Sequence, residues 1–260
     1  MAVQTAPSHL RCRAVLFDLD GVLTPTATVH ARAWKATFDA FMRTRAAQTG
    51  EPWKPFDPDS DYRAYVDGRQ RADGVRAFLA SRGISVDEGA PSDPPSADTI
   101  HGIGARKNHD FQRALHDGGI APYPDALALL DALRAKQVAC AVVSSSANAE
   151  AVLDAAGIAQ SFSERVDGRT AAELGLPGKP APDAFLEAAR RLGVEPSAAA
   201  VIEDAIAGVQ AGRAGHFGWV IGVARHGEDA ELKAAGADHV VQNLDVVLPL
   251  LMPNSEEFSG

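Results

Sequence analysis

Two aspartates stand one residue apart directly after a short apolar run near the amino end of the chain. The stretch AVLFDLDGVL begins at Ala14, and its two carboxylates belong to Asp18 and Asp20. A carboxylate at the end of a buried strand is costly unless a bound group or a reaction needs it. Because side chains two positions apart on an extended chain point the same way, both carboxylates can face one site. Such a pair suits a reaction in which one carboxylate is the nucleophile and the other moves protons.

Further polar residues follow other apolar runs of the chain. Ser144 follows Ala139–Val143, Lys179 lies in GKPAPD, and Glu203 and Asp204 follow AAAVI. The carboxyl ends of parallel strands can converge on one crevice, so we expect these residues to gather there. Carboxylates gathered in this way repel, and two unit charges about 4 Å apart cost ~4 kcal/mol even at an effective dielectric of 20. A hard divalent cation with oxygen ligands, most simply Mg²⁺, removes that cost.

The elements that must position these residues alternate between strand and helix. Short runs rich in β-branched residues predict strands, and the longer segments between them predict helices. This alternation is typical of an α/β fold with a Rossmann-like, doubly wound parallel sheet. The predicted strands are Ala14–Phe17, Val138–Ser144, Ala199–Ile202, Trp219–Val223 and His239–Val241, and the predicted helices are Asp125–Lys136, Ala147–Ala156, Pro182–Leu192 and Ala205–Ala214.

From about Thr26 to Gly119 the pattern changes. Apolar residues such as Trp34, Phe38 and Phe41 recur at helical spacing, and no strand pattern is evident. We therefore expect an inserted helical cap domain over residues 26–119. Residues 1–25 and 120–260 would form the Rossmann-like catalytic core.

The composition is that of an ordinary globular protein. The chain has 260 residues, of which 46% are hydrophobic and 23% charged, and its formal net charge is −9. Nucleic acid and anionic membranes are bound mainly through basic patches, so we expect neither as a partner. No run approaches the roughly 18 apolar residues of a membrane span, and the first residues (MAVQTAPSHLRCR) lack a signal-peptide pattern. A cytoplasmic monomer is the expected state.

In order and spacing, the polar motifs resemble those of the haloacid dehalogenase superfamily of phosphoryl-transfer enzymes. The sequence holds DLDGV, a serine after an apolar strand, a lysine before PAPD, and ED after another apolar strand. The resemblance implies that Asp18 forms an aspartyl-phosphate, and that Asp20 is acid to the leaving oxygen and base to the incoming one. It also implies that Ser144 hydrogen-bonds the phosphoryl oxygens and that Lys179 neutralises charge in the transition state.

The same resemblance implies a Mg²⁺ site. Its ligands would be the Asp18 carboxylate, the Asp20 backbone carbonyl and Asp204, with Glu203 bound to the ion or to one of its ligands. Taken singly, the motifs have ordinary explanations, since a DxD pair occurs in turns and Asp204 could cap a helix. Because all of these motifs occur together and in the order of the superfamily, we favour a phosphoryl-transfer site over the ordinary explanation of each motif.

The longer string DGVLTPTATVHARAW resembles the β-phosphoglucomutase branch of that superfamily. Thr26, His30 and Trp34 match the pattern of the branch, and GRQRADG, RKN and SSSAN resemble its cap and loop motifs. The resemblance implies conversion of β-D-glucose 1-phosphate to D-glucose 6-phosphate through a glucose 1,6-bisphosphate intermediate. The partner would be a small-molecule sugar phosphate.

By the same resemblance, a second phosphate site would use Arg71, Ser146 and Asn148, and arginine is suited to bidentate phosphate contacts. His30 would couple closure of the cap to the positioning of Asp20, and Lys107 would contact the sugar or sense closure. Ordinary structural roles, such as a half-buried histidine or a solvated arginine, stay open. The substrate-binding candidates are Thr26, His30, Trp34, Arg71, Lys107, Ser145, Ser146 and Asn148.

Two residues depart from the pattern of the branch. Pro25 stands where aspartate is usual, and Ala147 stands where a lysine assists the second phosphate site. A sugar-phosphate phosphatase of the same fold, in which water attacks the aspartyl-phosphate, is therefore the alternative. A dehalogenase or a phosphonate-cleaving enzyme is disfavoured because neither uses Asp20. A sensor without activity is disfavoured because it needs no nucleophile and acid together.

Overall fold

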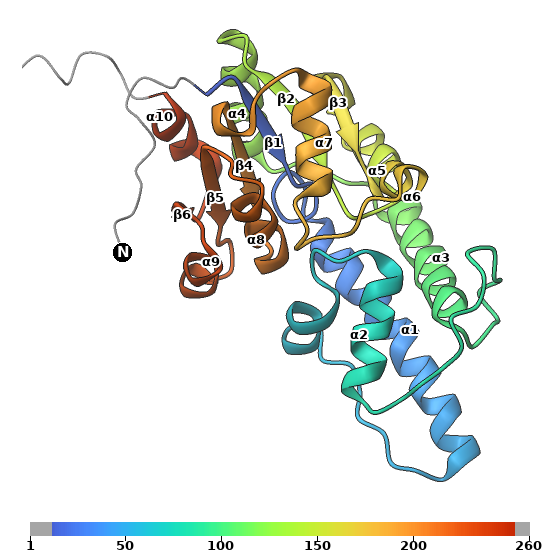
Figure 1. Ribbon diagram of the computed structural model, residues 1–260. Coiled ribbons are helices and arrows are strands. Elements are labelled where there is room, and N and C mark those ends of the chain that lie inside the picture. Colours follow the sequence, from blue (N-terminus) through green and yellow to red (C-terminus); the bar gives the residue numbers. More distant parts are fainter. Residues whose placement is uncertain (1–11, 253–260) are drawn as a thin grey trace, which may run out of the picture. The chain divides into compact units, whose positions relative to one another are not determined.

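The computed structural model describes residues 12–252 of the chain. The chain divides into two compact units, one comprising Met1–Thr24 and Ala121–Gly260 and the other comprising Pro25–Ile120. The first contains every strand of the sheet and is called the sheet unit, and the second is called the helical unit (Figure 1). The outermost residues at both ends, including part of the segment tested for a signal peptide, lie outside the described range.

Six parallel strands form one sheet in the order β3-β2-β1-β4-β5-β6. This order is that of a doubly wound sheet, the fold class that the sequence predicted, and β1 lies in the centre between β2 and β4. Strands of such a sheet are buried on both faces, which explains their nearly continuous apolar runs. The strands are β1 (Ala14–Phe17), β2 (Ala139–Val143), β3 (Glu164–Val166), β4 (Ala199–Glu203), β5 (Trp219–Val223) and β6 (His239–Val241).

Helices cover the sheet, and alternate strand residues face opposite sides of it. On one side, Ala14 and Leu16 share a buried cluster with Phe185 of α7 and Val209 of α8. The helices of this unit are α4 (Pro124–Ala135), α5 (Ala149–Ala155), α6 (Gly168–Leu174), α7 (Asp183–Leu192), α8 (Ile206–Ala214), α9 (Asp229–Ala235) and α10 (Val247–Leu251), with short 3₁₀ turns η2 (Ala159–Ser161), η3 (Pro196–Ala198) and η4 (Leu244–Val246).

Strand β3 was not predicted. It has three residues, of which Glu164 and Arg165 are charged and only Val166 is fully buried. It pairs with β2 alone at the edge of the sheet. An edge strand this short has too few apolar residues to be recognised in the sequence. The sequence therefore predicted five of the six strands of this sheet.

The helical unit contains α1 (Thr26–Thr49), α2 (Arg71–Ser81), α3 (Ile100–Gly118) and a π-helical turn, η1 (Tyr62–Val66). The predicted helical insertion is therefore confirmed. Aromatic rings fill its core, where Phe38 stacks on Phe78 with 4.0 Å between ring centroids. The hydroxyl of Thr99 caps α3 by accepting a hydrogen bond from the Gly102 N–H at 3.0 Å. None of the described helices is long and apolar enough to cross a membrane.

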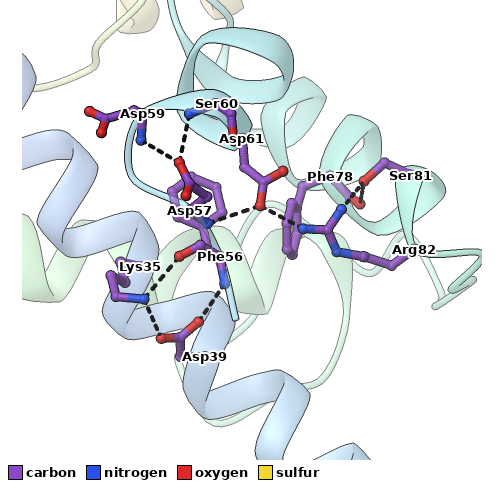
Figure 2. A network of polar contacts seen from close by, with 10 residues as sticks. All are labelled: Lys35, Asp39, Phe56, Asp57, Asp59, Ser60, Asp61, Phe78, Ser81 and Arg82. Carbon is purple, nitrogen blue, oxygen red and sulfur yellow. Dashed lines mark hydrogen bonds and ion pairs between the residues drawn. The ribbon is translucent and has the colours of Figure 1, made fainter. Parts of the chain in front are cut away.

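A pair of residues one turn apart on α1 fastens the segment that follows this helix (Figure 2). The Nζ of Lys35 donates to the carbonyl of Phe56 at 2.9 Å, and Oδ1 of Asp39 accepts from the Phe56 N–H at 2.8 Å. The two side chains are also paired with each other at 2.9 Å. Because both backbone groups of Phe56 are bonded in this way, its ring is held within the aromatic core.

A partly buried ion pair fastens the next part of this segment to the end of α2 (Figure 2). The Nη2 of Arg82 lies 2.5 Å from Oδ2 of Asp61, and the same oxygen accepts from the Asp57 N–H at 2.9 Å. The guanidinium also lies over the ring of Phe78, 4.7 Å from its centroid. The carboxylate, the arginine and the ring therefore join the segment, η1 and α2 into one packed body.

Candidate active site

Asp18 is the first residue after β1, and its position is set by the sheet. Its N–H donates to the carbonyl of Ile202 at 2.9 Å, which extends the pairing with β4 by one step. Oδ2 of Asp18 accepts from the N–H of Asp20 at 2.9 Å. Asp18 is only 6% exposed, and Asp20 is half-buried. The predicted nucleophile therefore stands where the order of parallel strands reverses, which is where ligands bind in such sheets.

The turn after Asp18 is closed by its own hydrogen bonds. The carbonyl of Leu19 accepts from the N–H groups of Leu23 and Thr24 at 3.0 and 3.1 Å, and the Gly21 N–H donates to the Thr24 carbonyl at 2.7 Å. Gly21 has a φ of +91°, and a Cβ placed there would lie 1.8 Å from Oδ2 of Asp204. Only glycine meets both requirements, so this turn leaves room for the Asp204 carboxylate.

Lys179 joins two of the predicted motifs in the buried centre of the site. Its Nζ donates to Oδ1 of Asp18 at 2.5 Å, to Oε1 of Glu203 at 2.5 Å and to the Val143 carbonyl at 3.1 Å. Burial alone would lower the pKa of Lys179, but the two carboxylates raise it above its ordinary value. The side chain is thus a charged ammonium that is fully hydrogen-bonded.

The carboxyl group of Asp18 is less well compensated. Burial raises its pKa well above the usual range, and Lys179 offsets this only in part because Glu203 and Asp20 add negative charge. An ionised nucleophile therefore requires further positive charge beside Asp18. A bound cation would supply it.

Three carboxylates are placed to hold such a cation. One oxygen from each of Asp18, Glu203 and Asp204 lies within 4.8 Å of the others. Glu203 ends β4, and its Oε2 accepts from the Ala205 N–H at 2.9 Å. A Cβ on Gly208 of α8 would lie 1.7 Å from Oε1 of Glu203, so the absence of a side chain there leaves space for this carboxylate. A donor set made of oxygen alone suits Mg²⁺ or Ca²⁺ and fits the predicted ion.

The loop after β2 is shaped by its serine hydroxyl groups. Ser144 donates its N–H to the Val166 carbonyl at 3.1 Å, and its Oγ accepts from the Ser146 N–H at 3.1 Å. The Oγ of Ser146 in turn accepts from the N–H of Asn148 at 3.2 Å. Ser145 is the middle residue of the first of these two turns and is half-buried. The predicted phosphate-binding residues of this loop therefore lie in two successive hydrogen-bonded turns.

In the helical unit, three of the predicted substrate-binding residues lie together. Lys107 is buried, its Nζ is hydrogen-bonded to Nδ1 of His30, and it lies 5.1 Å from the centroid of the Trp34 ring. His30 stacks on Phe111 with 4.0 Å between centroids. Thr26, the first residue of α1, is also buried. These contacts fix the directions of α1 and α3 in the unit, and they leave the predicted substrate roles as predictions.

Arg71, the first residue of α2, lies against α3. Its Nη2 donates to Oδ1 of Asn108 at 2.8 Å. One turn earlier on α3, a Cβ on Gly104 would lie 3.1 Å from Cδ of Arg71, so this glycine makes room for the methylene stem. Within the described residues of the helical unit, no carboxylate is paired with this guanidinium, and partial burial lowers its pKa. The structure therefore holds a positive charge here beside a neutral amide.

One residue that the sequence did not single out also bonds to the turn after Asp18. Arg225 lies two residues beyond β5 and contacts the backbone of Gly21 and Val22. The only signal in the sequence was its place at the carboxyl end of a predicted strand. Gly21 and Val22 precede Arg225 by 204 and 203 positions in the chain, so no local pattern could indicate these contacts.

Comparison with known proteins places this geometry in a family. Residues 12–216 match the model of the haloacid dehalogenase-like hydrolases. A β-phosphoglucomutase of Mycobacterium bovis is 51% identical over 241 residues, which is 92% of each chain, and one of Bacillus subtilis is 33% identical over 251 residues, which is 95% of this chain and 96% of the relative.

A solved structure agrees. The β-phosphoglucomutase of Clostridium difficile matches with a TM-score of 0.69 and 25% identity, covering 90% of this chain and 92% of that one. The structural match covers the chain as widely as the sequence matches do. The chain therefore belongs to the haloacid dehalogenase-like hydrolases, in their β-phosphoglucomutase-like branch.

Proposed function

We propose that this protein is a Mg²⁺-dependent β-phosphoglucomutase that interconverts β-D-glucose 1-phosphate and D-glucose 6-phosphate. The observation that carries the proposal is the 51% identity to the M. bovis β-phosphoglucomutase, which extends over 92% of the chain. A likeness of that length includes the helical unit as well as the sheet unit. It therefore bears on the substrate as well as on the phosphoryl chemistry.

In the proposed reaction the Asp18 carboxylate attacks the phosphorus of a bound phosphate ester. The new bond from aspartate oxygen to phosphorus forms as the bond to the leaving oxygen breaks, and Asp20 gives that oxygen its proton. In the return step a sugar hydroxyl attacks the aspartyl-phosphate, and Asp20 takes the proton of that hydroxyl. Transfer to glucose 1-phosphate gives glucose 1,6-bisphosphate, which then returns its other phosphoryl group to Asp18 and leaves glucose 6-phosphate.

The groups around Asp18 support this assignment. Lys179, held at 2.5 Å from Oδ1 of Asp18, would neutralise charge on the phosphoryl oxygens, and Ser144 would donate a hydrogen bond to them. The carboxylates of Asp18, Glu203 and Asp204, with the backbone carbonyl of Asp20, would hold Mg²⁺. When bound, the ion supplies the positive charge that lowers the pKa of the buried Asp18 carboxyl and shields it from the negative phosphate.

We assign recognition of the sugar phosphate mainly to the helical unit, which would act as the cap of a catalytic core formed by the sheet unit. Arg71 would bind the phosphate that is not being transferred, because it carries a charge that no described carboxylate of the helical unit neutralises. Ser146 and Asn148 would serve the same phosphate. The other proposed substrate-binding residues are Thr26, His30, Trp34, Lys107 and Ser145. A cytoplasmic monomer is the state in which we expect the enzyme to work.

The test is phosphorus NMR of the purified protein with Mg²⁺, β-D-glucose 1-phosphate and a trace of glucose 1,6-bisphosphate. Glucose 6-phosphate should accumulate with little free phosphate. Dominant release of free phosphate would instead establish a sugar-phosphate phosphatase, which is the function that Ala147, in place of a lysine, would favour. The same experiment with Asp18→Asn should give neither product.

A further inference from the structure

The turn after Asp18 is held from outside by one arginine. The hydrogen bonds within this turn end on the carbonyls of Leu19 and Thr24. The carbonyls of Gly21 and Val22 accept instead from Arg225, whose Nε lies 3.0 Å from the Gly21 oxygen and whose Nη2 lies 3.0 Å from the Val22 oxygen. Buried carbonyl groups need a donor, and Arg225 is the donor that completes this turn.

The guanidinium is itself fixed on its other edge. Its Nη1 lies 3.0 Å from Oδ2 of Asp125, and its Nη2 lies 3.2 Å from Oδ1. The Arg225 and Asp125 side chains are 13% and 11% exposed, and the guanidinium carbon lies 3.8 Å from the centroid of the Tyr123 ring. Asp125 is held in turn, because its Oδ2 also accepts from the Leu244 N–H at 2.8 Å. A lysine has one point of charge and cannot make this set of planar contacts.

These contacts also join the two places where the chain crosses the boundary of the sheet unit. The chain leaves the sheet unit after Thr24 and returns to it at Ala121. Arg225 bonds to Gly21 and Val22 just before the exit and to Asp125 just after the return. The Tyr123 N–H donates directly to the Leu23 carbonyl at 2.9 Å, which strengthens the same connection.

We propose that Arg225 is a positioning residue for the reaction at Asp18 and Asp20, and that Asp125 holds it in place. The inference rests on the proposed phosphoryl transfer at Asp18. Gly21 directly follows Asp20, and it packs so closely on Asp204 that a Cβ there would lie 1.8 Å from the carboxylate. A shift of the Gly21 carbonyl therefore displaces the proton-transfer group and a proposed metal ligand together.

The test compares Arg225→Lys with wild type and with the matched control Arg213→Lys. Arg213 forms a half-exposed ion pair with Asp238 in the same unit, at 2.9 Å. In Arg225→Lys we expect kcat to fall about 10- to 100-fold, because small displacements of reacting groups are costly, and KM for glucose 1-phosphate to stay within about twofold. Mg²⁺ binding, measured by titration calorimetry, should weaken in the same variant. Arg213→Lys should change none of these values.

Asp125→Asn is the second variant, which keeps Arg225 and the shape of the acid. It should lower kcat less than Arg225→Lys, again without a rise in KM. Both variants are assayed at a temperature at which circular dichroism shows them folded. An unchanged kcat in both folded variants, or a rise in KM without a fall in kcat, overturns the proposal.

A second substrate separates this inference from the proposed function. Hydrolysis of p-nitrophenyl phosphate requires the aspartates and the metal ion but no sugar recognition. If wild type hydrolyses this ester and fails to convert glucose 1-phosphate, the proposed mutase activity is wrong. The role of Arg225 is then tested by comparing the rates of ester hydrolysis of Arg225→Lys and wild type. A loss of ester hydrolysis in Arg225→Lys supports the positioning role, and an equal rate contradicts it.

Discussion

Lys179 and Arg225 of the sheet unit and Arg71 of the helical unit are largely enclosed side chains with different kinds of partner. In the sheet unit, Lys179 is bonded to the carboxylates of Asp18 and Glu203, and Arg225 is bonded to the carboxylate of Asp125. In the helical unit, Arg71 donates to the neutral amide of a residue on α3. Both cations of the sheet unit are thus paired with carboxylates of the same unit, whereas Arg71 is bonded to a neutral group.

A second arginine at the other end of α2 shows that this difference belongs to the position and not to the unit. Arg82 follows the last residue of the helix and is paired with Asp61 at 2.5 Å, against the ring of Phe78. One helix therefore carries an arginine that stabilises the fold at its end and an arginine beside a neutral group at its start. The partner of a cation indicates which of the two roles it has, and four predictions test this.

The largest effect is expected for Asp18→Asn, which removes a carboxylate from the acidic cluster around Lys179 and keeps the shape of the side chain. Turnover of both glucose 1-phosphate and p-nitrophenyl phosphate should fall by at least about a thousandfold, because an amide does not form the acyl phosphate. Steady-state rates and intact-protein mass spectrometry measure this. A phosphorylated or active Asp18→Asn protein would show that another residue is the nucleophile.

The next largest effect is expected for Arg71→Met, which removes the charge that lacks a carboxylate partner. The kcat/KM for glucose 1-phosphate should fall about 100-fold, whereas hydrolysis of p-nitrophenyl phosphate and the melting temperature should change little.

Asn108→Asp sharpens this prediction, because it places a carboxylate 2.8 Å from the guanidinium and makes Arg71 resemble Arg82. It should lower kcat/KM for the sugar phosphate about 10-fold while it preserves the fold. If Asn108→Asp and wild type use the sugar phosphate equally well, Arg71 does not bind its phosphate.

A smaller effect, on stability alone, is expected for Arg82→Met. This change leaves the carboxylate of Asp61 without its cation in a largely buried place, so the free energy of unfolding should fall by about 2 kcal/mol. Urea unfolding followed by circular dichroism measures the loss, with Arg71→Met as the matched control. Below the melting temperature, kcat and KM of Arg82→Met should equal those of wild type, and altered kinetics would contradict the division between the two arginines.

The smallest effect concerns the pH dependence of stability at Asp125. Burial alone would raise its pKa, but the hydrogen bonds from Arg225 and from backbone N–H groups leave the pKa below its ordinary value. A lowered folded-state pKa adds stability above the pKa of the unfolded chain, about 4, and this stability is lost as the pH falls through the folded value. The free energy of unfolding of wild type should therefore exceed that of Asp125→Asn by about 1 kcal/mol at pH 7. This difference, measured by urea unfolding at a series of pH values, should shrink below pH 4. A difference that does not change with pH would exclude this linkage.

The fold was predictable where local pattern and burial agree. The apolar runs at Ala14–Phe17 and Trp219–Val223 are strands with the predicted bounds, because a strand buried on both faces carries its signal in every residue. The short edge strand at Glu164–Val166 was missed, because two of its residues are charged and its pairing depends on a neighbour far along the chain.

The candidate site divides in the same way. Asp18 and Glu203 could be predicted to converge because both stand at strand ends, where topology alone brings residues together. The contacts of Arg225 with Gly21 and of Arg71 with Asn108 could not be predicted. The partners are 204 and 37 positions apart, and they meet only through tertiary packing. The close approach at Gly104 is equally invisible without coordinates, since a missing side chain leaves no pattern in the sequence.

Two residues without side chains set the volume of the acidic cluster. A methyl group at Gly21 would occupy the place of the Asp204 carboxylate, and one at Gly208 would occupy the place of the Glu203 carboxylate. Part of the information that specifies the acidic site is therefore carried by uncharged positions. A survey that sorts related chains into active and inactive ones by their aspartates alone would misclassify any chain in which one of these glycines has become alanine. A diagnostic signature for the site should include Gly21 and Gly208 beside the acids.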